Sequence, residues 1–378
     1  MHLYSIDPHT KKINHLTPGI GEVETMHLGK DGKTIYYVTN ISDSNRRHIW
    51  MVDPAKANPT ILTKGNKIEY NPSEVNNGFV YLQASATKPS WPMYRTEGKE
   101  QAIAADLFPS HFPTNLVTPS TILVKAMDGF KAPAQIFLPV NYDATKKYPA
   151  MIFLHGGSRR QMLEGFNYSS YYSNAYAVNQ YFASQGYIVM ALNYRSGIGY
   201  GLAFREADHY GMAGGSEVND LIAAGEYLKA RADVNAKKIG LWGGSYGGYL
   251  TAHGLSKRSD LFSAGVDIHG VHNWNDEEPN FAPWYDSLRF PAAGQIAYKA
   301  SPVYTAKGWK SPVLFIHGDD DRNVPFAETI HMIQQLRRQK VNVEEIIFPD
   351  EIHGFLLYKS WLKVDEACFD FIQRNFNK

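Results

Sequence analysis

The chain has little of what would tie it to an oxidising compartment or to a membrane. It holds a single cysteine, Cys368, so no disulfide can form within it. It has no run of about 18 apolar residues, so no membrane-spanning helix is predicted. Residues 1–20 lack the basic start and apolar stretch of a secretory signal peptide. We therefore expect a cytoplasmic protein with no membrane partner.

An excess of either charge is also missing. The 38 Lys and Arg residues balance 37 Asp and Glu residues, which disfavours nucleic acid as a partner. Among the 14 histidines, His269 and His272 lie three residues apart, but no cysteine or carboxylate accompanies them in a metal-site pattern. We interpret both as structural and expect no metal and no cofactor. The 44% of hydrophobic residues is ample for a core.

The most informative motif is Gly-Gly-Ser-Tyr-Gly at residues 243–247, which spells G-x-S-x-G. A serine hydroxyl becomes a useful nucleophile when a sharp strand-to-helix turn exposes it and a base lies beside it. The apolar segment 238–242 is predicted to be the incoming strand, and 249–255 the start of the helix. Ser245 is therefore the candidate nucleophile.

A nucleophilic serine needs a histidine base and an acid that orients the histidine. In α/β-hydrolases these groups follow the serine in the order acid, then histidine. The predicted strand 312–316 leads into a loop with Asp319, Asp320 and Asp321, and the predicted strand 343–348 leads into a loop with His353. Loops at the carboxyl ends of parallel strands meet at one edge of the sheet. We interpret His353 as the base and an aspartate of the first loop as the acid.

These motifs resemble those of the prolyl oligopeptidase family of serine peptidases, in particular its acylaminoacyl peptidase and dipeptidyl aminopeptidase members. The resemblance covers about residues 118–378 and implies Asp321 as the acid, with Asp319 and Asp320 as neighbouring alternatives. The segments that carry it are 155–157, 193–201, 243–249, 317–325 and 350–354.

An oxyanion hole needs two hydrogen-bond donors aimed at the developing negative charge. One is predicted to be the backbone N–H of Tyr246, the residue after the nucleophile. The other is expected in the loop His155-Gly156-Gly157, and the resemblance implies Gly157, with Gly156 as the alternative. Many relatives have proline after these glycines, whereas this chain has Ser-Arg-Arg at 158–160, a departure that concerns the substrate side of the pocket.

The first hundred residues contain an internal repeat. Residues 3–8 recur at 49–54 and residues 16–19 at 62–65, both with an offset of 46, and 34–38 has a looser counterpart at 78–82. Short alternating strands with a period in the forties are typical of propeller blades. An unrelated small β domain is the alternative. The segment has room for about two blades, fewer than a closed propeller needs.

Downstream of a proline-rich hinge near residues 108–115, predicted strands and helices alternate. This alternation predicts an α/β fold with a mostly parallel sheet covered on both faces. We expect a partial β-propeller-like region over residues 1–112 and an α/β-hydrolase domain over residues 113–378.

Aromatic residues between two predicted strands, at 272–291, are candidates for a substrate pocket. Trp274, Trp284 and Tyr285 are the predicted substrate-binding residues, and packing of this loop onto its own domain is the alternative. In the same loop Glu277 and Glu278 could bind a substrate amine or could be ordinary solvated acids.

We interpret the chain as a serine hydrolase that cleaves short peptides through an acyl-enzyme. A carboxylesterase acting on small acyl esters is the alternative, since one triad serves both reactions. A non-catalytic binding or scaffold protein is a remote third, which the complete triad disfavours. Two blades would leave open edges and apolar positions such as Ile35, Tyr37, Val80 and Leu82 uncovered, so a homo-oligomer is expected.

Overall fold

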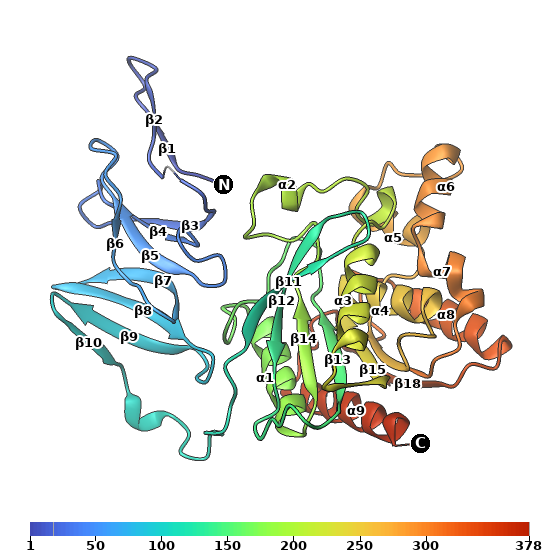
Figure 1. The fold of residues 1–378 in the computed structure, drawn as a ribbon. Helices are drawn as coiled ribbons and strands as arrows, with labels where there is room; N and C mark the ends of the chain where they lie inside the picture. Colours follow the sequence, from blue (N-terminus) through green and yellow to red (C-terminus); the bar gives the residue numbers. More distant parts are fainter. Residues whose placement is uncertain (18, 378) are drawn as a thin grey trace. The chain divides into compact units, whose positions relative to one another are not determined.

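The computed structural model of the protein describes residues 1–17 and 19–377 and divides into two compact units (Figure 1). Pro18, within the repeated segment 16–19, and Lys378 lie outside the described residues. The first unit comprises Met1–Pro119, Met162–Ala177 and Ile198–Ala203, and the second comprises Ser120–Gln161, Val178–Gly197 and Phe204–Lys378. Among the described residues, no helix has both the length and the apolar composition needed to cross a membrane.

The first unit contains two four-stranded antiparallel sheets whose strands follow one another in chain order. A four-stranded antiparallel meander is the fold of one propeller blade, so the prediction of about two blades is confirmed. The first sheet is formed by β3 (Val23–Leu28), β4 (Ile35–Thr39), β5 (His48–Val52) and β6 (Thr60–Ile61). The second is formed by β7 (Ile68–Val75), β8 (Gly78–Ala84), β9 (Trp91–Thr96) and β10 (Lys99–Ala102).

The sequence repeat reflects equivalent strands. In the first copy, residues 3–8 overlap β1 (Tyr4–Ile6) of a separate antiparallel hairpin, and residue 16 directly follows its second strand, β2 (Ile13–His15). In the second copy, residues 49–54 overlap β5 and residue 62 directly follows β6. The looser pair of segments, 34–38 and 78–82, falls on β4 and β8, the second strand of each four-stranded sheet. The repeated segments therefore lie on or next to strands of the first unit.

One expectation about the blades is wrong. Tyr37 was expected to lie uncovered, but its side chain is fully buried in a small core with Leu16, Val23 and Val52. Its ring also stacks near that of Trp50, with the centroids 6.4 Å apart. Residues 35, 80 and 82 are half-buried. The strand faces of each blade thus cover part of their own apolar surface.

The second unit is built on one eight-stranded sheet with the order β11-β12-β14-β13-β15-β16-β17-β18. The β11–β12 pair and the β12–β14 pair are antiparallel, and all other neighbours are parallel. This is the α/β-hydrolase arrangement, as predicted. The strands are β11 (Ser120–Lys125), β12 (Lys131–Phe137), β13 (Tyr148–Leu154), β14 (Ile188–Leu192), β15 (Val234–Gly244), β16 (Ala264–Ile268), β17 (Val313–Gly318) and β18 (Val343–Phe348).

The central strands are continuous apolar runs because helices cover the sheet. All five residues of β14 and all five of β16 are buried, a pattern typical of parallel sheets shielded on both faces. Helices α3 and α4 contact each other and β15, and α9 contacts β15, β16 and β17 (Figure 1). The helices are α1 (Ser170–Ser184), α2 (Leu202–Arg205), α3 (Val218–Ala230), α4 (Tyr246–Lys257), α5 (Trp274–Phe281), α6 (Pro291–Lys299), α7 (Pro302–Thr305), α8 (Phe326–Arg338) and α9 (Tyr358–Phe376), with 3-10 turns η1 (Ala105–Leu107), η2 (Gly211–Ala213) and η3 (Ala306–Gly308).

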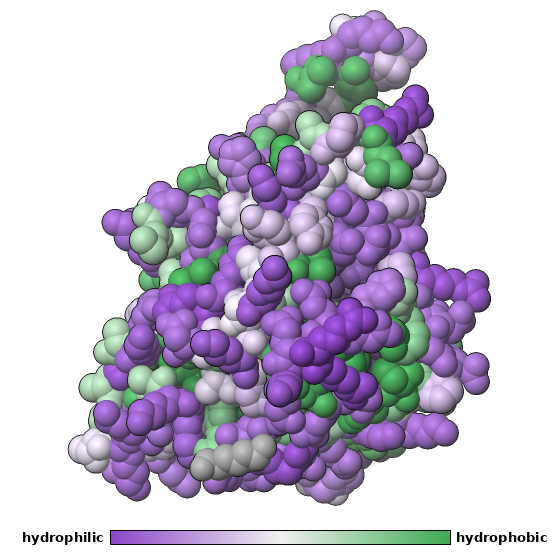
Figure 2. All heavy atoms as spheres, turned by 90° about the vertical axis from the view of Figure 1, so that its right-hand side faces the viewer, coloured by the Kyte–Doolittle hydropathy of each residue, from purple (hydrophilic) through white to green (hydrophobic). Residues whose placement is uncertain are grey.

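Figure 2 shows one face of the molecule. The face drawn in Figure 2 is mostly hydrophilic, with hydrophobic residues in separate groups. The cysteine of α9, Cys368, is buried.

A buried ionic cluster joins the β11–β12 turn to α3. The Arg195 guanidinium donates from Nη2 to Asp220 Oδ1 at 2.6 Å and from Nη1 to Asp128 Oδ2 at 2.6 Å. It also lies 4.3 Å from the ring centroid of Phe130. The Asp220 side chain is fully buried, whereas that of Asp128 is 40% exposed. The two carboxylates are therefore in very different surroundings although they share one partner.

Because a buried ion that loses its partner is costly, Asp220→Asn should lower the unfolding free energy of the second unit by about 3 kcal/mol. Asp128→Asn, the matched control at the exposed partner, should cost about 0–1 kcal/mol. Urea unfolding followed by tryptophan fluorescence measures both. Equal shifts of the two midpoints would contradict the assignment of Asp220 as the buried anchor.

Candidate active site

Ser245 lies on a sharp turn between β15, which ends at Gly244, and α4, which begins at Tyr246. Its backbone has φ 59° and ψ −121°, a conformation that residues with a side chain rarely adopt. The turn is secured by hydrogen bonds from Ser245 N to Ile268 O at 2.9 Å and from Tyr249 N to Ser245 O at 3.0 Å. The strand–turn–helix context predicted from the motif is present, and the turn holds the serine half-exposed among buried neighbours.

Two glycines of the motif allow α4 to lie directly against the end of β13. A Cβ added at Gly247 would be 2.0 Å from Leu154 O, and one at Gly243 would be 2.5 Å from the same atom. Any side chain at these positions would therefore push the helix away from the strand. The close approach also brings the segment that starts at His155 beside the first turn of α4, since His155 O would lie 3.0 Å from the Gly247 Cβ.

The two predicted oxyanion donors lie in these adjoining segments. Tyr246 is the first residue of α4, and Gly157 follows β13 with φ 33°. Within residues 1–17 and 19–377 no hydrogen-bond acceptor is recorded for either backbone N–H. The Tyr246 side chain has a partner of its own, because its hydroxyl donates to Glu217 Oε1 at 2.6 Å.

Asp321 and His353 form a short hydrogen bond at the carboxyl ends of β17 and β18. His353 Nδ1 lies 2.6 Å from Asp321 Oδ2, and since an ionised carboxylate can only accept, the imidazole donates. The other oxygen, Oδ1, accepts from the backbone N–H groups of Asn323 at 2.9 Å and Val324 at 3.0 Å. Burial would raise the pKa of Asp321, but hydrogen bonds from His317 and His353 hold it well below its ordinary value.

The neighbouring aspartates have other partners. Asp319 Oδ1 accepts from Asp350 N at 2.7 Å, and Asp320 pairs with Arg322 at 3.1 Å on the surface. Of the three aspartates that the sequence offered, the structure brings only Asp321 to His353.

Two further histidines, to which the sequence analysis gave no role at this pair, border it. His317 Nε2 is 3.1 Å from Asp321 Oδ2, and its Nδ1 is 2.8 Å from Thr329 Oγ1. The His269 ring lies 4.2 Å from that of His353, centroid to centroid. Because His317 lies only four residues before Asp321 in the chain, its contact with this aspartate could have been expected from the sequence. For His269 no sequence signal pointed to His353, because the contact joins the ends of strands that lie far apart in the chain.

His269, Asp321 and His353 also offer ligand atoms within 4.8 Å of one another, a grouping that could hold a divalent metal. The Asp321 carboxylate, however, already accepts four hydrogen bonds, two on each oxygen. A metal would have to displace at least one of them. The donor set therefore fits an imidazole-orienting carboxylate better than a metal ligand.

His272, the other member of the histidine pair, has a supporting place. Its Nε2 lies 2.9 Å from Asp267 Oδ2, and its backbone N–H donates to Glu328 Oε2 at 2.8 Å. Burial would lower the pKa of His272, but the carboxylates of Asp267 and Glu328 raise it above its ordinary value. The cluster fixes the turn that joins β16 to α5.

The three predicted pocket residues differ in burial and in their contacts. The Trp274 side chain is buried and its ring lies 5.8 Å from that of Tyr246, next to the nucleophile turn. Tyr285 is buried and donates from its hydroxyl to Asn275 Oδ1 at 2.7 Å. Trp284 is 70% exposed. Only Trp274 therefore contacts a residue that adjoins Ser245.

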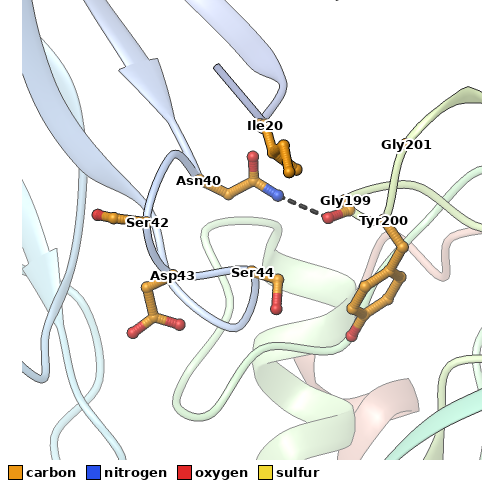
Figure 3. A pocket seen from close by; sticks show the side chains of 9 residues that line it. Ile20, Asn40, Ser42, Asp43, Ser44, Gly199, Tyr200 and Gly201 are labelled. Atoms are coloured by element: carbon orange, nitrogen blue, oxygen red, sulfur yellow. Dashed lines mark hydrogen bonds between the residues drawn. The ribbon is translucent and has the colours of Figure 1, made fainter.

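A separate pocket of about 380 Å³ lies within the first unit (Figure 3). Its loops are joined by a hydrogen bond from Asn40 Nδ2 to Gly199 O at 2.7 Å. Its only charged lining residue, Asp43, is paired with Arg46 at 2.8 Å. The pocket therefore offers no unpaired charge to a ligand.

Comparisons with known proteins agree with this fold. A sequence model of the prolyl oligopeptidase family matches residues 171–378, and one of the dipeptidyl peptidase IV N-terminal region matches residues 1–93. Dipeptidyl-peptidase 5 of Porphyromonas gingivalis is 25% identical over 389 residues, which cover 100% of this chain and 55% of that protein. Dipeptidyl aminopeptidase BIII of Pseudoxanthomonas mexicana is 31% identical over 218 residues, which cover 55% of this chain and 30% of that protein.

Solved structures show the same fold. A puromycin-hydrolyzing peptidase of Mycobacterium tuberculosis superposes with a TM-score of 0.83 at 20% identity, over 99% of this chain and 58% of the other. An acylaminoacyl peptidase in complex with Z-Gly-Gly-Phe-chloromethyl ketone gives 0.79 at 21% identity, over 98% and 58%. This chain thus spans little more than half the length of these proteins. The family match itself covers more than half of the chain, and the chain belongs to the prolyl oligopeptidase family.

Proposed function

We propose that the chain is a serine hydrolase that cleaves short peptides through an acyl-enzyme, with Ser245, Asp321 and His353 as its triad. The observation that carries the proposal is the 2.6 Å hydrogen bond between Asp321 and His353 at the sheet edge that also bears the strained Ser245 turn. The backbone N–H of Ser245 donates a hydrogen bond to Ile268 O. His269, which follows Ile268 in the chain, lies against the ring of His353. The relatives named as dipeptidyl peptidases and acylaminoacyl peptidases support peptides as the substrates.

In this mechanism the Ser245 hydroxyl attacks the scissile carbonyl while His353 Nε2 takes its proton. Asp321 accepts from His353 Nδ1, which selects the tautomer with a basic Nε2 and stabilises the imidazolium. His353 then protonates the departing amine, and a water molecule, activated by the same imidazole, releases the acyl group. The N–H groups of Tyr246 and Gly157, with Gly156 as the alternative to the latter, stabilise the oxyanion.

For the substrate pocket we propose that Trp274 supports the acyl side, because it contacts Tyr246. Trp284 and Tyr285 stay predictions from the sequence, as do the domain boundaries, 1–112 for the propeller-like region and 113–378 for the catalytic domain. A cytoplasmic location is likewise a proposal, which rests on the sequence.

Ser245→Ala should reduce hydrolysis by several orders of magnitude, and fluorophosphonate should label Ser245 alone.

Asp321→Asn should lower kcat by about 10⁴-fold, because the histidine loses its orienting acceptor. Asp319→Asn and Asp320→Asn are the matched controls and should change kcat by less than about tenfold. If one of these neighbours proves as damaging as Asp321→Asn, the acid has been assigned to the wrong residue.

Peptide and ester cleavage can be separated by comparing kcat/KM for aminoacyl anilides with kcat/KM for short-chain nitrophenyl esters. A peptidase must protonate a poor amine leaving group, so it should turn over the anilides, whereas an esterase needs only the activated ester. Turnover of esters without anilides would favour the carboxylesterase. Turnover of neither substrate class would favour a binding or scaffold protein.

We also propose a homo-oligomer formed through the first unit. Strand β3 is an edge of its sheet, and its side chains Met26 and Leu28 are 62% and 68% exposed. An apolar edge strand offers unpaired backbone groups and a hydrophobic surface, which a second copy can cover in a symmetric dimer.

Light scattering at micromolar concentration should therefore show an oligomer for the 378-residue chain. Leu28→Lys should shift it towards the monomer, since the charge would be buried at the interface. His27→Lys is the matched control, because successive side chains of a strand point to opposite faces. A monomeric parent protein would refute the proposal, and equal effects of the two lysines would exclude β3 as the interface.

A further inference from the structure

His269 lies directly after β16, where the parts of the proposed triad meet. Its backbone N–H donates to Ile316 O at 2.7 Å, on β17, the strand that leads to the proposed acid. The carbonyl of the preceding residue, Ile268, accepts the N–H of Ser245 at 2.9 Å. The His269 ring lies 4.2 Å from the ring of His353, centroid to centroid. His269 is therefore connected with the nucleophile turn, with the strand before the acid and with the base.

The turn that carries His269 is held by contacts that do not involve its side chain. Asp267 Oδ1 accepts from Gly270 N at 3.0 Å, and Asp267 Oδ2 accepts from His272 Nε2 at 2.9 Å. A Cβ added at Gly270 would be 2.7 Å from the carbonyl carbon of Gly248, so the turn packs closely against α4. His269 itself has φ 41°, in the left-handed region where histidine is more common than most residues with a side chain. Its ring therefore projects from a well-supported turn.

The His269 side chain is fully buried among other rings. Besides His353, the rings of Phe355 and His317 lie near it, with centroids at 5.4 Å and 6.0 Å. Burial lowers the pKa of His269 well below its ordinary value, and the charges of the neighbouring histidines lower it further. The charge of Asp321 raises this pKa but does not offset the effect of burial. At neutral pH the His269 ring is therefore uncharged and does not repel an imidazolium that forms at His353.

The hydrogen bond to Asp321 holds only one edge of the His353 ring. His353 Nδ1 donates to Asp321 Oδ2 at 2.6 Å, but a hydrogen bond tolerates a range of angles, so the ring could still tilt about this contact. Such a tilt would move Nε2, the nitrogen that must reach the Ser245 hydroxyl. The His269 ring packs beside the His353 ring with the two planes inclined by 38°. This contact limits the movement that the hydrogen bond leaves open.

We propose that His269 is a positioning residue of the triad, whose ring packs against the His353 imidazole and keeps Nε2 of that imidazole directed at Ser245. This inference rests on the proposed function. His269 acts through the shape of its ring and transfers no proton. A flat, uncharged ring at this position is therefore sufficient, whereas a side chain without a ring leaves the imidazole free to tilt.

Two variants separate the ring from the rest of the side chain. His269→Asn removes the ring but keeps a residue type that tolerates positive φ. It should lower kcat for an aminoacyl anilide by about 10- to 100-fold and change KM by less than about threefold, because the base is misplaced while substrate binding is retained. His269→Phe restores a flat ring and should bring kcat to within about threefold of the parent value. The rate at which fluorophosphonate labels Ser245, which depends on the oriented base, should follow the same order.

His253→Asn is the matched control. His253 is an equally buried histidine of the same unit, its Nε2 lies 2.9 Å from Ala300 O, and no contact with a triad residue is recorded for it within residues 1–17 and 19–377. This variant should change kcat and the labelling rate by less than about threefold, which shows that loss of a buried histidine does not by itself slow the reaction. Urea unfolding followed by tryptophan fluorescence establishes that each variant is folded.

The two asparagine variants decide the inference even where the larger phenylalanine ring prevents folding at position 269. Equal losses of kcat in His269→Asn and His253→Asn, or no loss in His269→Asn, would overturn it. A folded His269→Phe protein as slow as His269→Asn would also overturn it, because the shape of the ring would then not be what matters. Failure of fluorophosphonate to label Ser245 in the parent protein would instead refute the proposed function, and this inference with it.

Discussion

The carboxylate of Asp321 is the interaction on which the arrangement of the site depends. One side chain accepts from His353, His317 and two backbone N–H groups, and so ties the loop after β18 to the loop after β17. Four donors compensate the loss of water around a fully buried charge. The low pKa of Asp321 follows from this set, and so does the fixed orientation of His353.

The second constraint is steric. The nucleophile turn can sit beside the loop at His155 only because Gly243 and Gly247 leave no side chain against Leu154 O. The strained backbone of Ser245 is then maintained by the bond from its N–H to Ile268 O and by the first turn of α4. The Asp321 carboxylate thus positions the His353 imidazole. Gly243 and Gly247 allow the turn that carries Ser245 to take its position.

The second unit contains buried carboxyl groups in two kinds of surroundings. Asp220 and Asp321 are surrounded by donors, and both are structural anchors of their loops. Glu277 lies in a comparably buried place, yet acids surround it and its own helix is secured through Asn275 and Trp274. This contrast separates carboxylates whose charge is compensated by donors from one that burial and the surrounding acids keep protonated at neutral pH.

Features that depend on neighbouring residues, and on the succession of motifs along the chain, could be predicted from the sequence. The glycines around Ser245, the apolar runs before Asp321 and His353, and the offset of 46 between strand segments are local features of the sequence, so the nucleophile turn, the mostly parallel sheet and the blades were predictable, whereas the order of the strands in the sheet was not. Tertiary structure decided which of three adjacent aspartates meets His353, because loop geometry sends Asp319 to Asp350 N and Asp320 to Arg322. It also buried Tyr37 and Trp274, left Trp284 exposed, and enclosed Glu277 among acids. Those outcomes depend on which distant segments of the chain cover a side chain. The residues next to it in the sequence do not determine which segments these are.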